Sequence, residues 1–318
     1  MANASQIVSL IHSHFKSEDD RFATLALQIA AHEARLGHVS IAQQIREIIE
    51  SEKSKKAKLK VIRIHSDLSD LIYETFPKNR LVQLVLPEEL KLRIERILKE
   101  YRQRSKLQKH GLFHRRKILL VGPPGTGKSV TAATIAGELN LPLYSVQMDK
   151  IVTKYLGETS AKLRQVFDFI EMQKGVFLFD EFDAIGSERS KENEVGEMRR
   201  ALNSLLQFMD ASHSDSLIIA ATNNIALLDK ALFRRFEDIL YYQLPSPREA
   251  MLLLKNRLGS FGKGLTFLGL EIEVAGLSHA QLTQASDDAI KESILNDMSY
   301  VDSSILTSCL REKRHINH

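Results

Sequence analysis

The chain has 318 residues, of which 43% are hydrophobic and 26% are charged, and its formal net charge is +4. This composition is typical of a globular protein with a real core, and the length allows two or three compact units. The single cysteine, Cys309, excludes an internal disulfide framework and a metal site built on paired cysteines. Because the chain has no secretory leader and no apolar run of 18 residues, we expect a cytoplasmic protein without membrane insertion.

The first 76 residues contain no proline and one glycine, and their apolar residues recur at helical spacing. The spacing predicts one helix over residues 7–15, a second from Phe22 to near Gly37 and a third that begins at Ser40. Residues 61–76 are expected to add a fourth helix. We therefore predict a small helical domain over residues 1–76 that binds a partner or substrate.

Basic residues concentrate in two segments. Residues 51–60 hold five lysines against one acid, and residues 91–117 hold eleven Lys and Arg against two acids. The second segment lies in a predicted helix from Glu88 to about Gln108 and in the loop that follows it. Such charge suggests nucleic-acid binding, but no aromatic stripe interleaves the lysines, as stacking on single strands requires. A solvated helix face is the preferred interpretation.

An octet with the pattern of a phosphate-binding loop follows the apolar run 117–121. Its residues are Gly122, Pro123, Pro124, Gly125, Thr126, Gly127, Lys128 and Ser129. The glycines let backbone N–H groups point at phosphate oxygens. A strand before the octet and a helix over 129–139 after it would place a helix N-terminus at the phosphates. The pattern predicts that Lys128 contacts the β- and γ-phosphates of ATP and that Ser129 binds Mg²⁺.

A second apolar run, over residues 175–179, ends in adjacent carboxylates at Asp180 and Glu181. A strand followed by two acids is often a simple surface turn. Beside a phosphate-binding loop, however, the first acid of such a pair holds Mg²⁺. The second can orient and deprotonate the attacking water. We therefore predict that Asp180 is a metal ligand and that Glu181 is the catalytic base of ATP hydrolysis.

The order of these segments resembles the AAA branch of the AAA+ ATPases, as in katanin- and spastin-like remodellers and the ATPase part of membrane-bound AAA proteases. Residues 153–159, 218–223 and 231–237 also match, and the resemblance covers about residues 81–310. Among its members the chain looks most like small bacterial single-ring AAA proteins, some of which are encoded beside a subtilisin-like serine protease.

The resemblance implies roles for three further sets of residues. Lys154, Tyr155 and Leu156 would form a pore loop whose aromatic side chain grips a polypeptide. Asn223 would sense the γ-phosphate. Arg234 and Arg235 would be arginine fingers that act on ATP in the adjacent subunit. The plain alternatives are a half-exposed loop aromatic, a strand-end cap and a solvated basic pair.

The C-terminal part is expected to be an all-α lid. Residues 248–258, 280–295 and 301–310 have helical apolar spacing, and Pro245 and Pro247 separate them from the preceding part. The turn over residues 276–282 resembles the family's lid turn, which implies that His279 and Ala280 contact ATP. His279, however, stands where the family has a glycine, so the adenine contacts are expected to differ.

These observations together predict an α/β phosphate-loop NTPase domain of three layers with a parallel sheet over residues 77–246. The helical domain over 1–76 precedes it, and the lid over 247–318 follows it. We expect a homo-oligomeric ring, which the resemblance implies is a hexamer, that uses Mg²⁺ and ATP to thread or remodel a protein substrate. One alternative is an ATP-gated adaptor that recruits or restrains an effector, such as a separate serine protease. A nucleic-acid remodeller is a second alternative.

Overall fold

The computed structural model describes residues 19–35, 37–38, 41–47, 68, 70–153, 157–183, 192–224, 233–265 and 269–315. Its contacts divide the chain into two compact units, Met1–Asp67 and Leu68–His318. The second unit therefore begins earlier than the ATPase domain predicted from residue 77. The finer division into three domains stays a prediction. Within the described residues, no helix combines the length and the apolar character needed to cross a membrane.

The first unit contains helix α2 (Asp19–Arg35) and a helical segment over residues 41–47. Ala26, Ile29 and Ala30 are the buried hydrophobic residues among the described side chains of α2. These helices agree with the second and third helices predicted from the apolar spacing. The first predicted helix, over 7–15, and the lysine-rich segment 51–60 lie outside the described residues.

The second unit is built on a six-stranded sheet with the order β1-β3-β4-β5-β2-β6. The strands are β1 (Ile72–Thr75), β2 (Lys117–Val121), β3 (Leu143–Val146), β4 (Val176–Phe179), β5 (Leu217–Thr222) and β6 (Asp238–Tyr241). All neighbouring pairs are parallel except β1 and β3. The predicted parallel sheet is confirmed, with an antiparallel strand added at one edge.

Strand β1 corrects the helix that we predicted through residue 76. Ile72 is buried while Tyr73 is exposed, and this alternation is typical of a strand with one covered face. The strand is stabilised by pairing with β3, about seventy residues further along the chain. Pairing with a strand so far along the chain leaves no pattern in the local sequence. The helical spacing of the preceding segment therefore led to the wrong prediction of a helix through residue 76.

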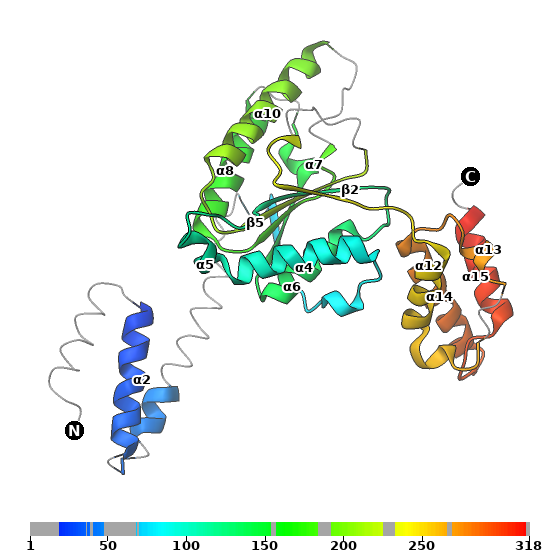
Figure 1. Cartoon of the computed structure of the whole chain (residues 1–318), viewed down its shortest axis with the longest axis horizontal. Helices are drawn as coiled ribbons and strands as arrows, with labels where there is room; N and C mark the ends of the chain where they lie inside the picture. Colours follow the sequence, from blue (N-terminus) through cyan, green and yellow to red (C-terminus); the bar gives the residue numbers. More distant parts are fainter. Residues whose placement is uncertain are drawn as a thin grey trace. The chain divides into compact units, whose positions relative to one another are not determined.

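Helices cover both faces of the sheet (Figure 1). Their bounds are α4 (Glu88–Arg102), α5 (Arg104–Gln108), α6 (Lys128–Leu139), α7 (Met148–Ile151), α8 (Glu158–Met172) and α10 (Glu192–Ala211). Alternate residues of β4 face opposite layers. Val176 and Leu178 join the core beneath α4 and α6, and Phe177 and Phe179 contact aromatic rings of α8.

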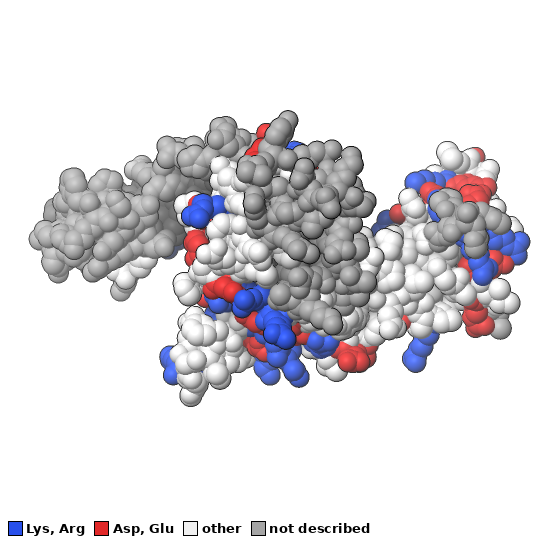
Figure 2. All heavy atoms as spheres, turned by 90° about the horizontal axis from the view of Figure 1, so that it is seen from above, with Lys and Arg blue, Asp and Glu red and all other residues white. Residues whose placement is uncertain are grey.

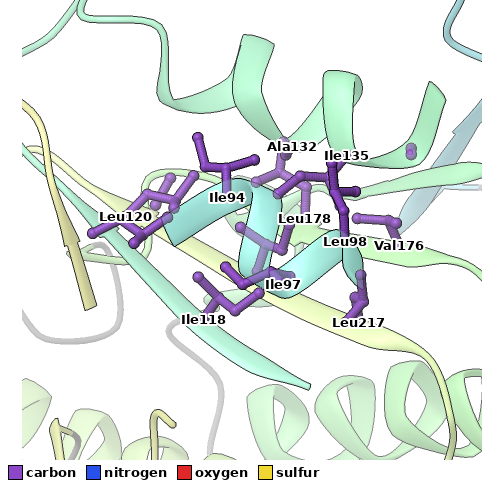
Figure 3. Close-up of a cluster of buried hydrophobic side chains, with 14 of the residues drawn as sticks. Ile94, Ile97, Leu98, Ile118, Leu120, Ala132, Ile135, Val176, Leu178 and Leu217 are labelled. Carbon is purple, nitrogen blue, oxygen red and sulfur yellow. The ribbon is translucent and has the colours of Figure 1, made fainter. Parts of the chain in front are cut away.

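The core on the α4 side consists mainly of aliphatic side chains from helices α4 and α6 and from strands β2, β3, β4, β5 and β6. Figure 3 shows part of this cluster. Helix α4 contributes buried residues at the spacing of one helical face, namely Leu90, Ile94, Ile97, Leu98 and Tyr101. Ala132 and Ile135 of α6 pack on the same cluster. This packing fixes the position of α6, and therefore of the loop that precedes it.

The C-terminal helices form a second hydrophobic core. They are α12 (Pro247–Leu258), α13 (Glu271–Val274), α14 (His279–Leu295) and α15 (Ser303–His315). The three longer helices confirm those predicted over 248–258, 280–295 and 301–310. Ser246 and Ser278 cap α12 and α14, each within a capping box. Leu254, Leu282 and Leu306 are completely buried between the helices.

Candidate active site

The phosphate-loop octet joins the end of β2 to the start of α6, as predicted. Its shape is held by hydrogen bonds between nearby residues. The Thr126 hydroxyl donates to the Pro123 carbonyl at 2.8 Å, and the Thr131 hydroxyl donates to the Gly127 carbonyl at 3.0 Å. Since β2 pairs in parallel with β5 and β6, the loop lies at the carboxyl edge of these strands, where open α/β sheets bind ligands.

At two positions of the loop, other atoms come so close to the backbone that only glycine fits. A Cβ atom at Gly122 would lie 2.3 Å from the Tyr242 carbonyl oxygen, which belongs to the main chain after β6. A Cβ atom at Gly125 would lie 2.6 Å from the Ser278 hydroxyl, and Gly125 has a φ of +73°. The Gly125 carbonyl also accepts a hydrogen bond from the Ala280 N–H at 2.9 Å. The loop and the turn before α14 are therefore in direct contact.

Lys128 is buried at the start of α6. Its ammonium donates hydrogen bonds to the carbonyls of Gly122 and Pro123 and to Asn223 Oδ1, at 2.7, 2.8 and 2.8 Å. Burial lowers the pKa of this ammonium, while the carboxylates of Asp180 and Asp183 act in the opposite direction. Asn223 follows β5, so the structure brings the predicted sensor and the predicted phosphate-binding lysine into contact.

The predicted metal ligands also meet. The Ser129 hydroxyl donates to Asp180 Oδ2 at 2.5 Å, although the two residues are 51 positions apart in the sequence. Ser129 lies in the first turn of α6, and Asp180 directly follows β4. A hydroxyl and a carboxylate oxygen at this spacing suit Mg²⁺, which takes one or two protein oxygens and completes its shell with water and phosphate oxygens.

Glu181 adopts a left-handed backbone conformation with a φ of 51°. Its N–H donates to Asp180 Oδ1 at 2.9 Å. The next residue, Phe182, is buried and its N–H donates to the Ala221 carbonyl at 2.9 Å. The Phe182 ring also makes an edge-to-face contact with Phe236, with centroids 6.0 Å apart. These contacts fix the backbone on both sides of Glu181, whose side chain is exposed.

A cleft of about 1240 Å³ connects these residues with the C-terminal helices. It is somewhat larger than ordinary ligand pockets, which are about 300–1,000 Å³. The predicted site residues that line it are Pro124, Gly125, Thr126, Gly127, Lys128, Ser129, Asp180, Glu181, Asn223, His279 and Ala280. The structure therefore brings most of the predicted site together in one place.

Sequence reasoning missed a second group of lining residues. Val82, Val85 and Leu86 precede α4, and Leu253 and Arg257 belong to α12. They are ordinary apolar and basic residues in their local sequence. They are identified as part of the site only because they line the same cleft as the phosphate loop in the folded chain.

Arg234 and Arg235 are not among the described residues that line this cleft. Both are exposed. Arg235 pairs with Asp210 of α10 at 3.0 Å. The predicted pore-loop residues Lys154, Tyr155 and Leu156 lie outside the described residues. The described residues on either side, Thr153 and Gly157, precede α8.

The basic segment 91–117 is partly neutralised by carboxylates. Arg93 pairs with Asp238, Arg102 with Glu138, Arg104 with Asp215 and Arg115 with Glu100. On the face drawn in Figure 2, basic and acidic side chains also lie next to one another. These pairings support the interpretation of the segment as a solvated helix face.

Comparison with known proteins identifies the class to which this fold and site belong. Residues 118–244 match the family model for the ATPase family associated with various cellular activities (AAA). The chain is 31% identical over 98% of its length to an uncharacterized AAA family ATPase of Sinorhizobium fredii, and it covers 96% of that relative. The chain belongs to the AAA family and is an ATPase.

Other relatives match a smaller part of the chain. An ATP-dependent zinc metalloprotease FtsH of Mycoplasmopsis synoviae is 35% identical over 64% of the chain, which covers 31% of that protein. A proteasome-activating nucleotidase of Methanoregula boonei is 40% identical over 43% of the chain, which covers 33% of that protein. The chain thus spans about a third of the length of these two relatives.

Proposed function

We propose that this ATPase assembles as a ring and uses Mg²⁺-dependent ATP hydrolysis to remodel a protein substrate. The observation that carries the hydrolytic part is the convergence of Lys128, Ser129, Asp180, Glu181 and Asn223 at one end of a single cleft. The relatedness to a protease and to a proteasome activator, as their names state, supports a protein substrate.

Each of these residues has a separate role in the proposed hydrolysis of ATP. Lys128 and the backbone N–H groups of the loop bind the phosphates, and Ser129 and Asp180 hold Mg²⁺. The metal ion supplies positive charge that neutralises the phosphate oxygens. Glu181 accepts a proton from the attacking water, while the Asn223 amide orients that water or the γ-phosphate. Asn223 is already within hydrogen-bonding distance of the Lys128 ammonium, so both groups would contact the same phosphate.

The position of the two arginines supports the proposed ring. Arg234 and Arg235 are exposed and contribute nothing to the cleft of their own chain. An arginine that reaches a phosphoryl transition state accelerates hydrolysis about 10³- to 10⁵-fold. In a ring, either arginine would reach the nucleotide of the neighbouring subunit, and a hexamer is the assembly that the family resemblance implies.

Stimulation of the ATPase rate tests the proposed substrate class. The rate of phosphate release is measured with an unfolded protein, with double- and single-stranded DNA, and without addition. We expect stimulation by the unfolded protein alone. Stimulation by DNA alone would instead favour a nucleic-acid remodeller. If neither stimulates, affinity capture with Glu181→Gln in ATP separates the remaining possibilities, because co-purification of one stoichiometric effector would favour an ATP-gated adaptor.

A further inference from the structure

Tyr242 is the residue after β6, and its backbone packs against the first residue of the phosphate loop. A Cβ atom at Gly122 would lie 2.3 Å from the Tyr242 carbonyl oxygen and 2.7 Å from the Tyr242 Cβ. The Tyr242 N–H donates to the Val121 carbonyl at 2.6 Å, directly after the paired residues of β2 and β6. The start of the loop is therefore fixed by the backbone of Tyr242.

The side chain of Tyr242 is linked to the last glycine of the same loop. The ring is buried in the core cluster that includes Ala132 and Ile135 of α6. Its hydroxyl donates to the Thr131 hydroxyl at 2.8 Å. Thr131 is completely buried, and its hydroxyl donates to the Gly127 carbonyl at 3.0 Å. A chain of two hydrogen bonds thus connects Tyr242 with Gly127.

The direction of both hydrogen bonds follows from the hydrogens that are present. A threonine hydroxyl has one hydrogen, and Thr131 directs it at the Gly127 carbonyl. The hydrogen between the two hydroxyls must therefore come from Tyr242. Burial raises the pKa of Tyr242, and the opposing effect of the hydrogen bond with Thr131 is smaller. The Tyr242 hydroxyl therefore keeps its hydrogen at neutral pH and acts as the donor.

The Gly127 carbonyl belongs to the peptide group at the start of α6. It accepts the Thr131 N–H at 2.8 Å as well as the Thr131 hydroxyl. Because a trans peptide group is planar, its C=O and N–H point in opposite directions. The N–H of Lys128 therefore points out of the helix N-terminus, where such groups bind phosphates. Fixing the carbonyl of Gly127 also fixes the direction of this N–H.

We propose that Tyr242 is a positioning residue for ATP hydrolysis, which acts through Thr131 on the peptide group between Gly127 and Lys128 and so directs a backbone N–H at the phosphates. The proposal rests on the proposed binding of the phosphates by this loop. Neither Tyr242 nor Thr131 is among the described residues that line the cleft. Any effect of the Tyr242 hydroxyl on the nucleotide must therefore pass through the backbone of the loop.

The variant Tyr242→Phe tests the proposal, because it keeps the ring and removes only the hydroxyl. Dissociation constants for ATP and ADP are measured by calorimetry. Both should rise by the same factor, about three- to tenfold, since both nucleotides carry the β-phosphate that the loop binds. In steady-state phosphate release, KM should rise by a similar factor while kcat changes less than about twofold. This split is expected for a contact that is equally strong in the ground state and the transition state.

Variants of Thr131 test the route of the effect. Thr131→Ser keeps a hydroxyl, so Tyr242→Phe should weaken ATP binding in that background as it does in the unmodified protein. Thr131→Val lacks the hydroxyl and should itself weaken ATP binding. Adding Tyr242→Phe to Thr131→Val should then cause no further loss. Such non-additivity is expected when two residues act through one interaction.

Tyr144 offers a matched control. It is another buried tyrosine of the same unit, its hydroxyl bonds to Glu74, and it is not among the described residues that line the cleft. Tyr144→Phe and Tyr242→Phe should both lower the melting temperature, because each loses a hydrogen bond of a buried hydroxyl. Only Tyr242→Phe should change KM and the nucleotide dissociation constants. The comparison separates a general loss of stability from an effect on the loop.

Two results would overturn the proposal. One is unchanged ATP and ADP affinity in a folded Tyr242→Phe variant, which would leave the hydroxyl a purely structural role. The other is an additive loss when Tyr242→Phe is combined with Thr131→Val, which would mean that the effect does not pass through Thr131. Lys128→Ala distinguishes these failures from failure of the site itself. If Lys128→Ala bound ATP normally, the phosphate-binding role of the loop would be wrong, and the role of Tyr242 with it.

Discussion

Glu181 combines an exposed carboxylate with a backbone conformation that residues with side chains seldom adopt. Its φ of 51° lies in the left-handed region, and such a conformation costs on the order of 1–3 kcal/mol. The surrounding contacts offset this free-energy cost, because Phe182 is buried and its N–H donates a hydrogen bond to the Ala221 carbonyl. A costly conformation held in this way is typical of a residue whose position matters for chemistry.

The first prediction concerns Glu181→Gln. The amide keeps the size of the side chain but cannot accept a proton from water. We expect ATP binding to persist and the rate of hydrolysis to fall by about 10²- to 10⁴-fold. The measurement is steady-state phosphate release together with the ATP dissociation constant. Lys128→Ala is the control and should lose binding itself. Near-normal turnover in Glu181→Gln would remove Glu181 from the role of base.

At the scale of single residues, the part of the candidate site around the phosphate loop could be predicted from the sequence, because its sequence pattern is local. Lys128, Ser129, Asp180 and Glu181 each stand at the end of an apolar run or within a fixed octet. The lining contributed by the segment before α4 and by α12 could not be predicted in the same way. Val85 and Leu253 have no such pattern, and they line the same cleft only because folding brings these distant segments together.

The contact between the phosphate loop and the turn before α14 joins two elements that lie about 150 residues apart. Gly125 is central to it, because its carbonyl accepts the Ala280 N–H and its lack of a side chain leaves room for Ser278. A nucleotide in the cleft would touch both elements, since residues of both line it. We therefore expect the position of the lid helices and the affinity for ATP to depend on this contact.

Gly125→Ala tests this dependence. Its Cβ would lie 2.6 Å from the Ser278 hydroxyl, so the turn must shift. Overpacking of this kind costs about 1–3 kcal/mol, which corresponds to an ATP affinity about 5- to 150-fold weaker. Gly264→Ala is the matched control, since Gly264 has a similar φ of +85° but no atom within 4 Å of its added Cβ.

The two glycine variants should therefore differ in binding rather than only in stability. Gly264→Ala is expected to lower the melting temperature and to leave the ATP dissociation constant unchanged. Calorimetric titration with ATP, together with thermal melting, makes the comparison. Equal ATP affinities in the two folded variants would mean that the contact at Gly125 does not position the lid for binding.

The elements themselves were predictable where their patterns are long and regular. Helix α14 (His279–Leu295) and helix α4 (Glu88–Arg102) follow the spacing of their apolar residues closely. The edge strand β1 (Ile72–Thr75) was not predicted, because four residues are too few to establish a period against the helical pattern before them. Its conformation depends on hydrogen bonds to β3, which the local sequence does not encode.

If the ring forms, the arginine variants should hydrolyse ATP at different rates when alone and when mixed with subunits of another variant. Arg234→Ala and Arg235→Ala should each fold and bind ATP, yet hydrolyse it at least tenfold more slowly, since their target lies in the adjacent subunit. Mixing either with Lys128→Ala subunits should restore part of the activity, because some interfaces then combine an intact arginine face with an intact ATP site. The readout is phosphate release across mixing ratios, and no rescue in verified mixed oligomers would contradict action in trans.

Arg234 and Arg235 need not contribute equally to the rate of ATP hydrolysis. Arg235 pairs with Asp210 at the end of α10, and an exposed ion pair of this kind is worth only about 0–1 kcal/mol. The pair orients Arg235 without preventing its exchange for a phosphate oxygen. Asp210→Asn serves as a control, since it should leave ATP binding intact and change hydrolysis far less than Arg235→Ala does.

The last prediction separates work on the substrate from ATP hydrolysis. It concerns Tyr155, which in the sequence comes after the phosphate-binding octet and before the acidic pair. An aromatic side chain beside Lys154 can contact any polypeptide through apolar surface without selecting its sequence. Tyr155→Ala should therefore keep basal ATP hydrolysis and oligomer formation while abolishing stimulation by an unfolded protein. Tyr155→Phe should retain that stimulation, because the ring rather than the hydroxyl makes the contact. Full stimulation in Tyr155→Ala would argue against threading and would favour an ATP-gated adaptor, in which nucleotide-dependent binding of an effector replaces mechanical work.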